Sequence, residues 1–353
     1  MPLPSPLRPL FLVLLLGQGA CDTPPAGPAV ETTTGLVADT IAVPATSPFQ
    51  SLAGGAILPD GRLALADPLA GRVWLLAGDG SPPSSIGSPG TGPGELAQSR
   101  GVLVEGDTLS VLSTGSLRLE RFTLQGAHLG GAPVATDVVA NPFELVAGTM
   151  ALATTLGRDS SLARLVTLDG TIRQRYGVAL AASPDNLNPA ALKASIRNGE
   201  VPEVFRNITL PVAGPAGDVW LVLHTEGKVQ RFDAAGSLQT EALLPEAEIE
   251  PMREEFFRAN TDDSNPGALQ AYLIATAGVA DQDGIWLLLA QPASQPSVLL
   301  RISRDGQVGE RLVVREGKGA RLLLHDPRRG AFYLVNQESG TVVRVRREAG
   351  ATP

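Results

Sequence analysis

The chain has 353 residues, 43% hydrophobic and 18% charged, a composition that can bury a sizeable core in one large domain. Its 39 glycines and 29 prolines, with few aromatic residues, are typical of an all-β protein rich in turns. The formal charge of -8 argues against nucleic acid as a partner, because phosphate binding needs a basic face.

The first 20 residues have the pattern of a signal peptide. Arg8 gives a positive start, an apolar run extends from Leu10 to Leu16, and small residues follow up to Ala20. A membrane span needs about 20 apolar residues, so this run is too short to be one. We therefore expect the protein to be exported into a bacterial cell envelope.

Cys21 is the only cysteine, so no disulfide can form within the chain. The stretch Gly19-Ala20-Cys21 resembles a bacterial lipoprotein cleavage box, although Gln18 stands where that box usually has an aliphatic residue. We expect a lipid on Cys21 that anchors the protein to a membrane, on the periplasmic or the extracellular side. A secreted protein cleaved after Gly19 is the alternative. Residues 21–34, with Pro, Gly and Thr, are predicted to form a flexible tether.

From residue 35 a short unit returns six times: a turn glycine, a strand-like run, a polar break, a second strand and another turn glycine. The two glycines of a unit are 19 to 22 residues apart, and the pairs are Gly61 and Gly80, Gly106 and Gly126, Gly148 and Gly170, Gly217 and Gly236, Gly284 and Gly306, Gly330 and Gly350. Repeats of roughly 40–50 residues built from short strands indicate a β-propeller. We predict an all-β, six-bladed β-propeller with four strands, A to D, in each blade, over residues 35–350.

The last unit is incomplete, because only three residues follow Gly350. An unpaired blade edge would invite aggregation. The segment Gly35–Pro44 alternates apolar and polar residues and precedes the first complete unit. We predict that it supplies the missing strand of the sixth blade and closes the ring.

Two connections between strand D of one blade and strand A of the next carry inserts, at about 183–206 and about 245–270. The first has Asn188 as a helix cap, Pro189 at the first helical position and a closing Gly199. The second has Ile249, Met252 and Phe256 at helical spacing. Both are predicted to be helical. Strands alternate in direction within a blade, so these inserts share a face with the B-to-C turns, and that face is the first place to look for a site.

The B-to-C turns place one polar residue each, six or seven residues after the first glycine of a unit, in a ring around the channel. These six ring residues are Asp67, Ser113, Thr154, His224, Gln291 and Asn336. Such a ring can hold a small ligand or a cation such as calcium. The other interpretation, which we prefer, is that the side chains satisfy the amides of their turns. Asp67 is the only carboxylate among them, which is little charge for a divalent ion.

Three histidines are spaced in a way that suggests one ligand from each of three blades. However, His224 falls at a B-to-C turn, His325 at the end of a strand A on the opposite face, and His128 beyond a C-to-D turn at the outer edge. We therefore expect that they do not converge, and we predict no metal site and no cofactor.

Two recurring segments carry a resemblance to a known family. One is Gly90-Thr91-Gly92-Pro93-Gly94-Glu95-Leu96, and the other is the ending Arg-Phe-x-x-x-Gly at Arg121–Gly126 and Arg231–Gly236, with a variant at Arg301–Gly306. In these residues the chain resembles the bacterial six-bladed β-propellers with NHL-like repeats. The resemblance implies the fold over about residues 36–348 and no particular activity. Gly90–Gly94 lacks the lysine and the helix of a phosphate loop and is interpreted as a flexible connection.

The sequence therefore favours a monomeric binding or scaffold module of the cell envelope, with a protein or glycan partner, over an enzyme. The alternative is a metal-dependent hydrolase or lyase of the lactonase type with its site in the central channel. That chemistry needs several carboxylate or amide ligands, and the ring offers Asp67, His224 and Asn336. A purely structural envelope protein is a third interpretation.

Overall fold

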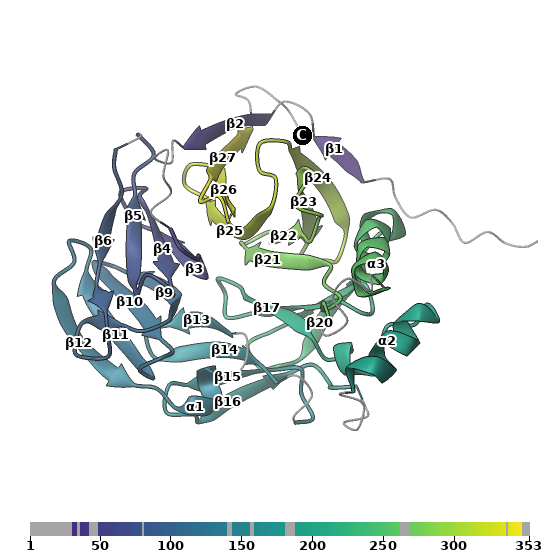
Figure 1. Cartoon of the computed structure of the whole chain (residues 1–353), viewed down its shortest axis with the longest axis horizontal. Helices are drawn as coiled ribbons and strands as arrows, with labels where there is room; N and C mark the ends of the chain where they lie inside the picture. The colour runs from purple at the N-terminus through teal and green to yellow at the C-terminus, as the bar shows by residue number, and fades with distance from the viewer. Residues whose placement is uncertain are drawn as a thin grey trace, which may run out of the picture.

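The computed structural model is a six-bladed β-propeller, with six four-stranded antiparallel sheets arranged around a central channel (Figure 1). The structure describes residues 30–33, 36–41, 49–79, 81–139, 143–155, 159–180, 188–261, 269–336 and 338–347. The fold predicted from the glycine repeat is confirmed.

The blades follow one another along the chain, and each runs from an inner strand A to an outer strand D. Blades one to three consist of β3 (Gly54–Ile57), β4 (Leu63–Asp67), β5 (Arg72–Leu76), β6 (Ser84–Ile86); β9 (Ser99–Glu105), β10 (Thr108–Ser113), β11 (Arg118–Thr123), β12 (His128–Pro133); and β13 (Phe143–Ala147), β14 (Met150–Thr154), β15 (Ala163–Thr167), β16 (Ile172–Tyr176). Two short parallel strands, β7 (Ser88–Pro89) and β8 (Glu95–Leu96), join blades one and two. A short helix, α1 (Thr136–Val139), precedes blade three.

The second half of the ring repeats this order. Blades four to six consist of β17 (Thr209–Ala213), β18 (Val219–Leu223), β19 (Lys228–Phe232), β20 (Leu238–Leu243); β21 (Ala275–Ala280), β22 (Gly284–Leu289), β23 (Ser297–Ser303), β24 (Val308–Val314); and β25 (Ala320–Asp326), β26 (Ala331–Asn336), β27 (Val342–Arg347). The inner strands contact one another in ring order, β3 with β9, then β13, β17, β21, β25 and back to β3.

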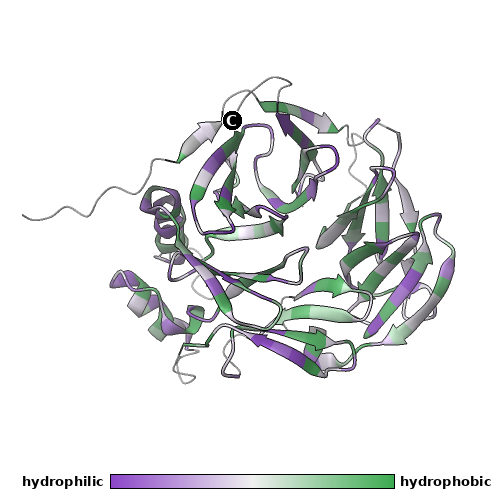
Figure 2. Cartoon of the chain, turned by 180° about the vertical axis from the view of Figure 1, so that it is seen from behind, coloured by the Kyte–Doolittle hydropathy of each residue, from purple (hydrophilic) through white to green (hydrophobic). Residues whose placement is uncertain are grey.

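The core lies between neighbouring blades. Strands β4, β18 and β22 are buried along their whole length, which is why they read as continuous apolar runs rather than as alternating patterns. In Figure 2 the strands of the blades carry much of the hydrophobic colour. Trp220, at 1% exposure, belongs to the cluster that joins blades four and five.

An N-terminal strand closes the ring, as predicted. β2 (Leu36–Ile41) pairs antiparallel with β27, from Leu36 opposite Arg347 to Ile41 opposite Val342, and becomes strand D of blade six (Figure 1). Ile41 is buried beside Val342. Asp39 accepts hydrogen bonds from Arg344 and Arg346 across the seam, at 3.0 and 2.6 Å.

A second N-terminal strand was not predicted. β1 (Glu31–Thr33) pairs in parallel with β24 and adds a fifth strand to blade five. The last residues of the expected tether thus belong to a sheet, because β24 otherwise ends blade five with an open edge. The expected signal peptide, Cys21 and the tether up to residue 29 lie outside the described residues. Within the part that is described, no helix is long and apolar enough to cross a membrane.

Both inserts contain the predicted helices. In the first, α2 (Pro189–Arg197) begins after Asn188, whose side chain accepts from the amide of Ala190, and a short 3-10 helix, η1 (Glu203–Phe205), follows. In the second, α3 (Glu246–Thr261) buries Ile249, Met252 and Phe256. The two helices contact each other beside blades four and five. Residues 183–187 and 262–268 of the expected inserts lie outside the described residues.

Candidate functional site

The six ring residues do lie at the B-to-C turns, yet three of them form hydrogen bonds mainly with the backbone of their own blade. Asp67 is fully buried, and its carboxylate accepts from the amides of Gln50, Ser51 and Ala70, at 2.8, 3.2 and 2.9 Å, and from the indole of Trp74 at 3.2 Å. A carboxylate with four donors around it has no oxygen left for a cation. The preferred interpretation, that it satisfies turn amides, describes Asp67.

Ser113 and Asn336 do the same work in blades two and six. The hydroxyl of Ser113 accepts from the amide of Ala97 at 2.8 Å and donates to the carbonyl of Ala97 at 2.9 Å. The amide of Asn336 donates to the carbonyl of Lys318 at 2.8 Å. In each case the partner precedes strand A of the same blade, so the ring residue fixes how the chain enters its inner strand. Thr154 is fully buried at the end of β14.

His224 and Gln291 differ, because both line a cavity. The ring of His224 is 2% exposed, and its Nδ1 accepts from the amide of Ile274, in front of blade five, at 3.2 Å. Burial lowers its pKa from 6.5 to about 4, so the ring is neutral and keeps its proton on Nε2. Gln291 lies 3.6 Å from the sulfur of Met252 on α3.

The cavity lies between α3 and the B-to-C turns of blades four and five, and we call it the insert cavity. It has a volume of about 960 Å³. Apolar side chains such as Leu210, Met252, Phe256 and Leu273 form part of its wall, and the polar groups of Thr209, His224 and Gln291 lie among them. It is on the face predicted to carry the site.

Two hydroxyls at this cavity lack hydrogen-bond partners in the described part of the chain. Thr209 is 4% exposed and begins β17, and its Oγ1 is buried. Thr276 lies on β21, and its Oγ1 is also buried. Leaving a buried hydroxyl without a partner costs about 1–3 kcal/mol, so such a group at a cavity wall is a candidate for ligand contact.

The central channel contains a second cavity of about 570 Å³, the channel cavity, lined by all six inner strands. Leu210, Thr276 and Arg321 line both cavities, so the insert cavity adjoins the channel mouth at these residues. The remaining wall includes the glycines Gly54, Gly55 and Gly278 beside apolar side chains of the inner strands.

Glu144 on β13 is the carboxyl group of the channel cavity. It is half-buried, and its Oε2 accepts from the amide of Ala213 at 2.8 Å. Burial raises the pKa of Glu144 from 4.5 to about 7, against the smaller opposite effect of the Ala213 amide. A carboxyl that titrates near neutral pH in a cavity has the acidity that proton transfer requires.

The three histidines stay apart, in the places that their repeat positions predicted. His325 lies next to the last residue of β25, on the opposite face, and is stacked on Phe332 with ring centroids 4.4 Å apart. His128 begins β12 at the outer edge, with Nε2 2.6 Å from Glu120. Within the described ranges, no group of three or more His, Cys, Asp or Glu side chains is placed to hold a metal ion.

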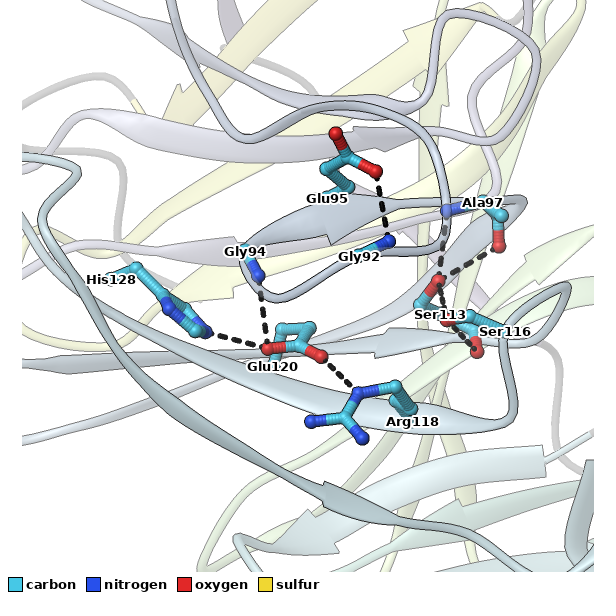
Figure 3. A network of polar contacts seen from close by, with 9 residues as sticks. All are labelled: Gly92, Gly94, Glu95, Ala97, Ser113, Ser116, Arg118, Glu120 and His128. Atoms are coloured by element: carbon cyan, nitrogen blue, oxygen red, sulfur yellow. Dashed lines mark hydrogen bonds and ion pairs between the residues drawn. The ribbon is translucent and has the colours of Figure 1, made fainter.

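The glycine-rich segment at 90–94, expected to be a flexible connection, makes hydrogen bonds to two carboxylates. Glu95 accepts from the amide of Gly92 at 2.8 Å, and the amide of Gly94 donates to Glu120 at 3.4 Å (Figure 3). Arg118 and His128 flank the same buried carboxylate. Burial raises the pKa of Glu120, but these donors outweigh it and hold the pKa below its ordinary value.

The sequence did not single out Thr209 of the insert cavity or Glu144, Arg100 and Arg321, which line the channel cavity. Each is near the start of an inner strand, where no motif marks it. A weak signal exists for three of them: a charged residue in an otherwise apolar inner strand faces either solvent or the channel. Only the three-dimensional structure of the closed ring shows whether such a side chain faces solvent or the channel.

No protein-family model matches the sequence, and no curated protein matches it either. Solved structures do match. They include a putative exported protein from Bacteroides fragilis, at 8% identity over 89% of this chain and 96% of that one with a TM-score of 0.50. A second is a calcium-binding protein, regucalcin, from Agrobacterium tumefaciens, at 11% identity over 91% and 96% with a TM-score of 0.50. A third is a protein of unknown function from Bacteroides thetaiotaomicron, at 8% identity over 89% and 76% with a TM-score of 0.51. At this identity the likeness shows the shared six-bladed propeller fold alone.

Proposed function

We propose that this six-bladed β-propeller is an exported, lipid-anchored binding module of a bacterial cell envelope that holds a small-molecule ligand in the insert cavity. The observation that carries the proposal is the insert cavity itself, about 960 Å³ in volume and lined by α3 and by the B-to-C turns of blades four and five. Small-molecule sites have volumes of roughly 300–1,000 Å³, with a few polar groups in a mostly apolar wall.

The polar groups at the wall support a ligand with hydrogen-bonding atoms. The unpartnered hydroxyl of Thr209 and the neutral ring of His224 lie among apolar side chains. A ligand oxygen or nitrogen at these groups would recover a hydrogen bond that the free protein lacks. This is a feature of a site rather than of a packing defect, because the same wall is otherwise closely built from α3 and two blades.

The matched variants Thr209→Val and Ala271→Trp test the site. Valine removes the hydroxyl and keeps the shape of the side chain, so it should stabilise the free protein by about 1–2 kcal/mol and weaken the binding of the ligand. Ala271 is exposed at the cavity rim, and tryptophan there should block it. A small-molecule library is screened by thermal shift against the full chain. Hits that lose their shift in both variants support the proposal. Hits that are indifferent to both place the ligand elsewhere and refute it.

Export and anchoring rest on residues 1–21. Cells fed a radioactive fatty acid should label the natural chain but not a Cys21→Ser variant, and the variant should leave the membrane fraction. Label that persists in Cys21→Ser would refute the anchor. A protein or glycan fragment from the envelope is the class of partner that this location would supply.

A second candidate, a hydrolase or lyase of the lactonase type, is favoured by one observation: Glu144 titrates near neutral pH in the channel cavity. Its test is a screen of lactones and esters, with and without divalent cations, in the natural chain and in Glu144→Gln. Turnover that disappears in Glu144→Gln favours the enzyme. Absence of turnover, together with ligands that depend on Thr209, favours the binding module.

A further inference from the structure

Three inner strands carry an extra residue at the same place. In β9 the pairing with β10 skips Arg100, in β21 the pairing with β22 skips Thr276, and in β25 the pairing with β26 skips Arg321. Each is a β-bulge at the second residue of strand A, where the strand starts on the face of the inserts. A bulge leaves its extra residue unpaired and redirects its side chain, and bulges often occur next to binding sites.

The bulges bring two arginines to the wall of one cavity. Arg100 and Arg321 both line the channel cavity, on either side of β3 in the ring of inner strands. Between them β3 offers Gly54 and Gly55, which have no side chains to fill the space. A Cβ on Gly54 would lie 2.2 Å from the carbonyl oxygen of Arg100, so this close approach of β3 and β9 requires glycine.

The ion pairs of the described residues leave both guanidinium groups out. Among the described residues, no carboxylate pairs with Arg100 or Arg321, whereas the arginine at the rim of the insert cavity, Arg258, pairs with Glu255 at 2.5 Å. Glu144 lines the same channel cavity but contacts the Ala213 amide instead. Both side chains are exposed at the concave wall, and two cations gathered there attract an anion, in a protein whose formal net charge is -8.

We infer that the channel mouth is an anion site, in which Arg321 and Arg100 hold the carboxylate, sulfonate or phosphate group of an organic acid whose apolar body occupies the insert cavity. Arg321 and Thr276 line both cavities, so one molecule can reach from α3 to the two arginines. Guanidinium groups bind such oxyanions through paired hydrogen bonds. The inference rests on the proposed function, because it names the class of ligand for the same site.

The test uses two dyes of similar shape, one charged and one not. The anionic dye is 1-anilinonaphthalene-8-sulfonate and the neutral one is N-phenyl-1-naphthylamine. Fluorescence titration of the full chain should give at least tenfold tighter binding for the anionic dye, the size expected for one charge-assisted pair. Arg321→Gln and Arg100→Gln should each remove most of that preference and leave the neutral dye unchanged. Inorganic phosphate should displace the anionic dye selectively.

Arg328→Gln is the matched control. Arg328 is exposed in the A-to-B turn of blade six, on the opposite face, so the same charge is removed away from the channel mouth. If this control weakens the anionic dye as much as Arg321→Gln does, the effect is general electrostatics and the anion site is refuted. If both dyes bind equally and respond to Ala271→Trp alone, the anion site fails and the insert cavity stands. If neither dye responds to Ala271→Trp, the proposed function itself fails.

Discussion

The carboxyl of Glu144 should make the protein less stable as pH rises through neutrality. Its pKa is raised from 4.5 to about 7 in the folded chain, so the folded state binds the proton more tightly than the unfolded one. Stability from this group is therefore complete below about pH 4.5 and is lost as pH rises towards 7. Each pKa unit corresponds to about 1.4 kcal/mol, so the full effect of the shift from 4.5 to about 7 is about 3.5 kcal/mol.

Glu144→Gln removes the titration and keeps an oxygen for the Ala213 amide. The free energy of unfolding, from urea titrations, is measured for both proteins at about pH 5 and about pH 8. The variant should gain about 2.5 kcal/mol relative to the natural chain between these two pH values, because most of the interval from 4.5 to 7 lies between them. Taking this double difference cancels every other titrating group.

Glu338→Gln is the control, since Glu338 is exposed in a turn of blade six and the substitution removes one negative charge in the same way. A double difference below about 0.5 kcal/mol for Glu144→Gln would refute the reasoning, because the carboxyl would then be as well solvated in the channel as in the unfolded chain. A gain equal to that of Glu338→Gln would attribute the effect to net charge instead.

The remaining predictions concern stability. The pKa of His224 is lowered from 6.5 to about 4, so the stability from this group is complete above about pH 6.5 and falls as the pH drops towards 4. In urea titrations, a His224→Asn variant should lose less free energy of unfolding than the natural chain over this pH range. An equal loss in both proteins would contradict the burial argument. Removing residues 1–34 deletes only β1 among the strands and should preserve a single cooperative thermal transition. Removing residues 1–41 also deletes β2, leaves β27 with an open edge, and should broaden or abolish the transition. Equal thermal transitions in the two truncated proteins would mean that β2 does not close the ring. Gly131→Ala places a Cβ 2.5 Å from the Glu120 carboxylate and should displace it from Arg118 and His128. The free energy of unfolding, measured by calorimetry, should fall by about 1–3 kcal/mol. Gly130→Ala is the control for backbone strain alone, because Gly130 has open space around it but a φ of 126°.

The fold was readable from the sequence because its turns need glycine. The second glycines of units two to five, Gly126, Gly170, Gly236 and Gly306, have φ of 95°, 89°, 82° and 86°, a region that other residues rarely adopt. The repeat of the blades is therefore visible in the sequence as a regular spacing of glycines. The closing strand was also predictable, since a blade with an open edge has to find a partner.

The candidate site was only partly predictable. Position in the repeat placed Asp67 and His224 at the B-to-C turns, but whether a polar side chain serves the backbone or a ligand depends on neighbours from other blades. The extra residue of a bulge is set by a mismatch between two strands, so Arg100 and Arg321 carry no local signal. β1 is three residues long and pairs with the free edge of β24. The sequence of those three residues does not predict this pairing.

The seam of the ring joins two segments that lie far apart in the sequence. Leu36 pairs with Arg347, so β2 can find its partner only after the residues of β27 have been synthesised. Until then blades one to five can assemble by local hairpins, but the circle stays open. Closure of this ring is therefore a long-range pairing, whereas the hairpins of the blades are local.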